Sequence, residues 1–163
     1  MRRALFAITL ITGLVGFPAG AVEVDNVEAL LTAAEAPAGV VFEVVSGDED
    51  ALGELLPVLK TDIKRLHARF PDLPVAIVSH GTEQFALTRD ERNNQPELHA
   101  ITEELVSDKA VDVHVCGAHA GWYDILPEDF PDYVDVSPSG PAQINDYRAL
   151  GYVLIVLPLA GSE

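Results

Sequence analysis

The chain has 163 residues, of which 48% are hydrophobic and 22% charged, and its 10 basic against 26 acidic residues give a net charge of −16. This length suffices for one domain with a substantial core, and the composition is that of a globular protein. A field this negative repels phosphate groups and anionic lipids, so we expect neither nucleic-acid binding nor stable membrane association of the mature chain.

The first 21 residues have the layout of a secretory signal peptide. Two arginines precede an apolar run, which ends at the small-residue segment PAGA. The run is shorter than the ~20 residues that a membrane-spanning helix needs, which favours cleavage after Ala21 over an uncleaved anchor. The mature protein is then expected to be periplasmic or secreted, with 8 basic against 26 acidic residues and a net charge of −18.

Residues 22–38 form an N-terminal leader with a short helical pattern, in which Val27, Leu30 and Leu31 make an apolar face and Asp25 is a candidate cap. The expected domain spans residues 39–163 and begins with a β-branched strand over 40–45. Apolar residues at helical spacing predict a helix over 48–70. Pro57 either sits in the first turn of this helix or kinks a longer one.

Further along, apolar runs predict strands over 74–80, 111–116, 133–136 and 152–157. Helices are predicted over 96–106 and 141–150, and a short helix or turn over 118–125. The polar stretch 81–95 is expected to be mostly loop, with an apolar turn at 85–87. Alternating helices and continuously apolar strands favour a three-layer α/β/α domain with a mostly parallel sheet of about five strands. The strand order stays open.

In such a sheet, ligands bind beyond the carboxyl ends of the strands. That rule selects one catalytic candidate, Cys116 at the end of the third strand, together with a set of candidate substrate-binding residues at the strand ends. These are Gly117, His80, Gly81, Ser139 and Gly140.

Cys116 is the only cysteine, so it cannot form an internal disulfide. In an oxidising compartment a lone thiol is a liability unless it is buried, paired or used. The N–H groups of the following turn are expected to point towards its sulfur and favour the thiolate, and His119 is placed to hydrogen-bond the sulfur or lend it positive charge. Free cysteine is also a common apolar filler, and position alone leaves both interpretations open.

A metal site is a rival use of Cys116, His114, His119 and His80, which have donor types that suit zinc or copper. Their spacing matches no standard ligand pair, so we expect no metal and no cofactor. His114 is more simply a satisfied strand histidine. The sequence also lacks a glycine-rich phosphate loop and a G-x-S-x-G elbow.

Several segments in this order and spacing resemble the DsrE/DsrF-like sulfur-relay family over about residues 40–157: VVFEVV, IVSHG, VHVCG, DILPEDF, VDVSPSG and the final GYVLIVL. The resemblance implies a parallel α/β sheet and assembly into homotrimers or hexamers. It also implies a cysteine that carries sulfur as a persulfide between partner proteins, a role that transfers to Cys116 alone. The well-described members are cytoplasmic, whereas this chain has an export signal.

The leading hypothesis is therefore an exported protein in which Cys116 accepts sulfane sulfur from a donor protein and passes it to an acceptor, with His119 as helper. One alternative is a small-ligand or metal-binding module that uses Cys116 and the nearby histidines. Another is an oligomeric protein in which Cys116 is inert and buried.

Overall fold

The computed structural model describes residues 26–108 and 110–157, so the predicted signal peptide lies outside the described residues. The helices are α1 (Val27–Leu31), α2 (Ala51–Arg69), α3 (Pro96–Ser107), α4 (Gly117–Gly121) and α5 (Gly140–Ala149), with 3-10 turns η1 (Thr82–Leu87), η2 (Asp90–Asn93) and η3 (Pro127–Asp129). The strands are β1 (Gly39–Val44), β2 (Val75–Ser79), β3 (Val111–Cys116), β4 (Asp135–Ser137) and β5 (Tyr152–Val156). None of these helices is both long and apolar enough to span a bilayer.

The five strands form one parallel sheet in the order β4-β3-β2-β1-β5. In this register Val44 of β1 pairs with Ser79 of β2, and Ser79 pairs with Val115 of β3. The carboxyl ends of β1, β2 and β3 therefore meet at one edge of the sheet. The strand order, which the sequence pattern left open, places three predicted site segments side by side.

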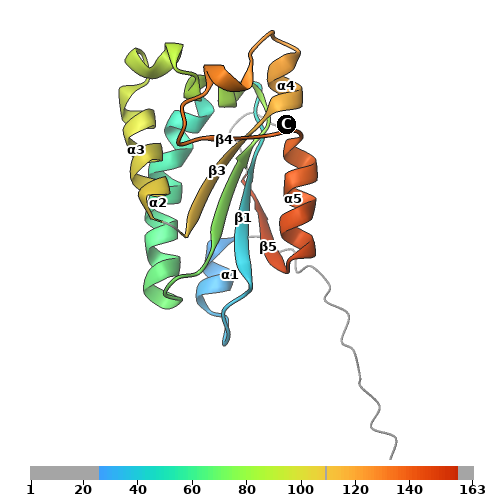
Figure 1. Cartoon of the computed structure of the whole chain (residues 1–163). Helices are drawn as coiled ribbons and strands as arrows, with labels where there is room; N and C mark the ends of the chain where they lie inside the picture. The colour runs from blue at the N-terminus through green and yellow to red at the C-terminus, as the bar shows by residue number, and fades with distance from the viewer. Residues whose placement is uncertain (1–25, 109, 158–163) are drawn as a thin grey trace, which may run out of the picture.

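Two apolar clusters hold helices on the two faces of the sheet, which confirms the predicted three-layer α/β fold (Figure 1). On one face, α1, α2 and α3 pack over β-strand side chains such as Phe42 and Val113. On the other face, α5 packs its Ile144 and Tyr147 against Val41, Ala76 and Val78. Full burial of each large apolar side chain contributes roughly 1.5–3 kcal/mol relative to leaving it exposed.

The element boundaries differ from the predicted ones at capped and bent positions. Helix α1 is capped by Asn26 rather than Asp25, because the Asn26 Oδ1 atom accepts the N–H of Ala29 at 3.0 Å. Helix α2 begins at residue 51 because the residues before it form a turn, in which Asp48 Oδ1 accepts the N–H of Asp50. Pro57 lies inside α2, past its first turn.

Candidate functional site

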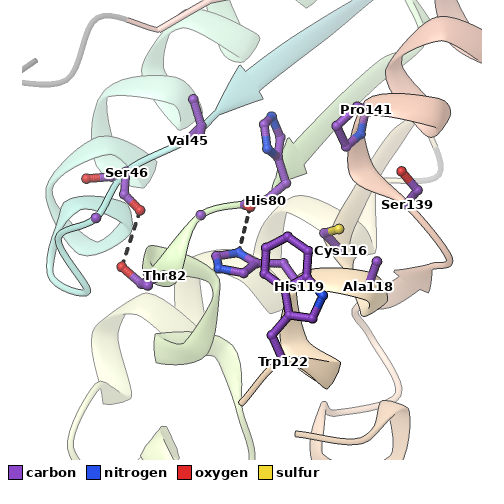
Figure 2. Close-up of a pocket in the computed structure, with 12 residues that line it drawn as sticks. Val45, Ser46, His80, Thr82, Cys116, Ala118, His119, Trp122, Ser139 and Pro141 are labelled. Carbon is purple, nitrogen blue, oxygen red and sulfur yellow. Dashed lines mark hydrogen bonds between the residues drawn. The ribbon is translucent and has the colours of Figure 1, made fainter. Parts of the chain in front are cut away.

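A pocket of about 580 Å³ opens at the carboxyl ends of β1, β2 and β3, where the loops into α2 and η1 meet α4 and the start of α5 (Figure 2). It collects residues from four segments that are far apart in the sequence. Its lining comprises Val45, Ser46, Gly47, His80, Gly81, Thr82, Cys116, Ala118, His119, Trp122, Ser139 and Pro141. The pocket therefore lies where the rule for parallel sheets predicts a ligand.

Cys116 is the last residue of β3 and contributes its side chain to the pocket, although it is only 4% exposed. Its backbone N–H donates to the side-chain Oε1 of Gln84 at 2.7 Å. Within residues 26–108 and 110–157 its Sγ atom has no hydrogen-bond partner. The thiol therefore faces the pocket, and none of the described residues hydrogen-bonds its sulfur.

His119 projects from α4 into the same pocket. Its Nδ1 lies 2.8 Å from the backbone carbonyl oxygen of His80 and 3.2 Å from Nε2 of Gln84. A carbonyl oxygen only accepts hydrogen bonds, so the shorter contact assigns the ring hydrogen to Nδ1. This leaves Nε2 with a free lone pair, and that nitrogen is the one able to take up a proton.

Aromatic rings surround the His119 imidazole. The ring centroids of Phe85, Trp122 and Tyr123 lie 5.6, 5.3 and 5.4 Å from it. Trp122 and Tyr123 are 79% and 54% exposed, so this side of the pocket presents open aromatic surface to solvent. The described contacts include no hydrogen bond between His119 and the Cys116 sulfur, so the two groups share the pocket without being paired.

Contrary to what the sequence suggested, the backbone N–H groups of the turn after Cys116 do not all point towards its sulfur. The N–H of Ala118 donates to the carbonyl oxygen of Pro138 at 3.1 Å and is not free to face the sulfur. Gly117 does not line the pocket; a Cβ atom there would lie 3.2 Å from the Ser137 carbonyl oxygen. Gly117 therefore serves the close packing of α4 against β4.

Two other predicted residues, Gly81 and Gly140, allow close approaches around the thiol. A Cβ on Gly81 would lie 2.2 Å from both the Ser46 carbonyl oxygen and Oε2 of Glu83. A Cβ on Gly140 would lie 2.7 Å from Cβ of His80 and 3.3 Å from Cβ of Cys116. Gly81 lines the pocket, whereas Gly140 brings the start of α5 against its wall.

His80 acts mainly through its backbone. Its ring points away from His119 (Figure 2), and its Nε2–H donates to Oε1 of Glu43 at 2.8 Å. Its carbonyl oxygen, by contrast, holds the His119 ring. Ser139 lines the pocket as the N-cap of α5, where its side-chain oxygen accepts the N–H of Ala142 at 3.5 Å.

Sequence reasoning missed two fully buried polar residues, Glu83 and Gln84, because they lie in a stretch that its polarity marked as loop. Glu83 accepts hydrogen bonds from the N–H of Ser46 at 2.7 Å, the hydroxyl of Ser79 at 2.6 Å and the N–H of Gly81 at 2.9 Å. Its carboxylate therefore joins the ends of β1 and β2. The available signal was their position directly after a buried strand, at the ligand-binding edge.

His114 lies outside the pocket lining, in a separate buried chain of hydrogen bonds. Its Nε2 accepts the hydroxyl of Tyr147 at 2.8 Å, and its Nδ1–H donates to Ser137 Oγ at 3.1 Å, which in turn donates to Gln143. Burial lowers the pKa of His114 and raises the pKa of Tyr147 to about 12. His114 thus has a structural role.

The histidines therefore do not converge on the thiol. Both nitrogens of His114 are engaged, and His80 is engaged by Glu43. In the part of the chain that the structure describes, no group of three or more histidine, cysteine or carboxylate side chains is arranged to hold a metal ion.

No family model and no curated protein matches this sequence. Two solved structures share the fold. A protein of unknown function from Methanobacterium thermoautotrophicum, MTH1491, is 21% identical, with a TM-score of 0.54 over 72% of this chain and 97% of its own. The YchN protein from E. coli is 13% identical, with a TM-score of 0.53 over 73% of this chain and 98% of its own.

At these identities the likeness concerns the fold, a parallel five-stranded sheet with helices on both faces. Both neighbours are matched over nearly their whole length, so the common part is a complete domain. The agreement shows the fold of this chain.

Proposed function

We propose that this protein handles sulfane sulfur and that Cys116 is the acceptor, carrying the sulfur as a persulfide. The observation that carries the proposal is the position of the thiol: it ends in a pocket of about 580 Å³, and no side chain or backbone group of the described residues hydrogen-bonds its sulfur. A reactive cysteine needs an accessible sulfur at a site where a substrate fits beside it. The family resemblance supports the choice of sulfur as the transferred group.

In the proposed reaction the Cys116 thiolate attacks the outer sulfur of a persulfide donor. His119 offers the basic Nε2 in the same pocket, since its Nδ1–H is held by the His80 carbonyl oxygen. Because His119 and the sulfur are not hydrogen-bonded to each other, the proton passes between them through the substrate or a water molecule. The aromatic rings around His119 fix the orientation of the imidazole.

The proposal also covers the location of the protein and its assembly. Residues 1–21 support an exported protein, and the family resemblance supports a homotrimer or hexamer that meets a sulfur-donor or acceptor protein. The exposed rings of Trp122, which lines the pocket, and of Tyr123, which lies 5.4 Å from the His119 ring, offer a surface for such contacts. N-terminal sequencing of the protein from fractionated cells tests the export, and light scattering of the purified protein tests the assembly.

Intact-mass measurement after treatment with a persulfide donor tests the chemistry. The wild-type chain is expected to gain the mass of one sulfur atom, reversibly with a reductant, whereas Cys116→Ser is expected to gain none. His119→Gln is expected to slow the gain about tenfold or more, as removal of a general base does. A thiol that reacts with iodoacetamide but never gains sulfur would exclude a carrier role.

A second candidate function is binding of a small organic ligand without chemistry at the thiol. The apolar lining, with Val45, Trp122 and Pro141, favours it. In that case Cys116 reacts with Ellman's reagent only after unfolding, as its 4% exposure alone would suggest. Reaction in the folded state at a rate comparable with that of a free thiol supports the carrier function instead.

A further inference from the structure

We infer that the sulfur donor which enters this pocket is an organic persulfide with an apolar body, and that small inorganic dianions such as thiosulfate are poor donors. The inference rests on the proposed function and names its substrate class. Three properties of the pocket carry it: its size, the charge of its surroundings, and the aromatic ring at its mouth.

The size of the pocket exceeds what sulfur transfer alone requires. A volume of about 580 Å³ lies within the roughly 300–1,000 Å³ typical of sites for organic ligands. The wall facing that volume is largely apolar, with Val45, Ala118, Trp122 and Pro141. An apolar body gains free energy by leaving water for this wall, and a bare oxyanion does not.

The charge of the surroundings opposes an anion. Among residues 26–108 and 110–157, no lysine or arginine lines the pocket, and the basic side chains of its lining are the imidazoles of His80 and His119. His80 is paired with the carboxylate of Glu43, and the buried Glu83 lies directly behind Ser46 and Gly81. A dianion that enters loses hydration without a cation to replace it, in a chain of net charge −16.

Trp122 supplies a specific partner for an aromatic or aliphatic body. Its ring is 79% exposed and packs edge-on at 5.3 Å from the His119 ring, so one face remains open at the pocket mouth. A body held against this face places its persulfide group near His119 and Cys116. Apolar and aromatic contacts of this kind discriminate between donors of the same sulfur chemistry.

The transfer is balanced without a further reactant. The Cys116 thiolate forms a bond to the outer sulfur of R–S–SH, and the S–S bond of the donor breaks with its electron pair leaving on R–S⁻. The proton lost by the Cys116 thiol ends on that leaving group. The products are the Cys116 persulfide and R–SH, so the Cys116 sulfur is oxidised while the inner sulfur of the donor is reduced.

The test compares three donors on the reduced full-length chain: benzyl hydropersulfide, glutathione persulfide and thiosulfate. The rate of sulfur gain on Cys116 is followed by intact mass, with the site confirmed by peptide mapping. Benzyl hydropersulfide is expected to react about tenfold faster than glutathione persulfide, whose body carries carboxylates, and thiosulfate slower still. The rate of each donor with free cysteine measures its intrinsic reactivity. Each rate on the protein is divided by the rate of the same donor with free cysteine.

Two variants locate the preference in the pocket. Trp122→Ala is expected to reduce the ratio of the benzyl to the glutathione rate about fivefold. Val45→Lys, at a 48% exposed position on the pocket wall, is expected to raise the thiosulfate rate about fivefold by supplying the missing cation. Val58→Lys adds the same charge at a 58% exposed position on α2 outside the pocket and is the matched control. Light scattering checks that each variant keeps the wild-type assembly.

The outcomes separate this inference from the proposed function. If thiosulfate or glutathione persulfide loads Cys116 as fast as benzyl hydropersulfide after normalisation, the donor class is wrong while the carrier function stands. Equal effects of Val45→Lys and Val58→Lys would likewise overturn it, because the charge would then act through the whole protein. If no donor loads Cys116 although iodoacetamide alkylates it, both fail.

Discussion

The side-chain oxygen of Gln84 accepts the backbone N–H of Cys116 at 2.7 Å, and Gln84 is fully buried. The other end of the same amide lies 3.2 Å from the His119 ring. One side chain from η1 therefore touches both the residue that bears the thiol and the residue that bears the base. Only the contact with Cys116 is a hydrogen bond, because the Gln84 N–H₂ group and the Nδ1–H group of His119 are both donors. Gln84 itself does not line the pocket.

Replacing Gln84 with methionine keeps the volume but removes the acceptor. The N–H of Cys116 is then buried without a partner, which is expected to lower the free energy of unfolding by about 1–3 kcal/mol. Urea unfolding measures this change. Gln95→Met is the control, because Gln95 makes its 3.3 Å contact to Asp50 at the surface, and its effect should stay within about 0.5 kcal/mol. Equal effects of the two substitutions would refute the role given to Gln84.

Glu83→Gln tests the carboxylate that joins the ends of β1 and β2. Glutamine keeps one acceptor oxygen and turns an N–H₂ group towards donors, so at least one of the three hydrogen bonds is lost. We expect destabilisation of about 2–4 kcal/mol, together with faster amide exchange at Ser46 and Gly81. The exposed Glu35→Gln serves as control for the loss of one charge. Unchanged exchange at both amides would contradict the account.

Gly140→Ala tests the contact of α5 with the thiol segment. The new methyl group would meet Cβ of His80 at 2.7 Å, so the start of α5 must shift, at a cost of about 1–3 kcal/mol. The new methyl group would also lie 3.3 Å from Cβ of Cys116, so the rate at which the Cys116 thiol is alkylated is expected to change. At Gly47 the added methyl group has no atom within 4 Å, and Gly47→Ala should leave stability within about 0.5 kcal/mol. A neutral Gly140→Ala would show that α5 does not constrain this wall.

The stability of the fold should depend on pH through two buried histidines, His99 on α3 and His114 on β3. Burial lowers the pKa of both below the ordinary value of 6.5, so the unfolded chain binds more protons than the folded one just below that pH. The contribution of these two histidines to the free energy of unfolding is therefore complete above pH 6.5. It falls as the pH drops towards their pKa values in the folded state. His114→Gln should reduce this slope in urea unfolding between pH 7.5 and 5.5. An unchanged slope would contradict burial as the cause.

Much of the fold follows from the sequence because apolar periodicity reports burial directly. The run VVFEVV predicts a strand buried on both faces, and β1 is one. The order of the strands and the exact helix starts do not follow, because they depend on long-range packing and on single side-chain caps such as Asn26.

The candidate site divides in the same way. The strand-end rule predicted Cys116, His80, Gly81 and Ser139, which line one pocket, and also Gly117 and Gly140, which do not line it. His119 was predicted from its place in the turn after Cys116, and it lines the same pocket. Glu83 and Gln84 were not predicted. In the sequence, a polar residue that follows a strand and faces solvent cannot be told from one that accepts hydrogen bonds from buried N–H groups. Glu83 also accepts from the nearby Ser79 and Gly81, but its partner Ser46 lies 37 residues away along the chain, and Cys116, the partner of Gln84, lies 32 residues away. No local pattern indicates these two distant partners.

Whether Cys116 carries sulfur is best decided by the intact mass of the reduced wild-type protein after exposure to an organic persulfide. We expect a gain of one sulfur atom on Cys116 that a reductant removes, and no gain in Cys116→Ser. A folded protein whose Cys116 is alkylated by iodoacetamide, yet gains no sulfur from any donor, would contradict this expectation.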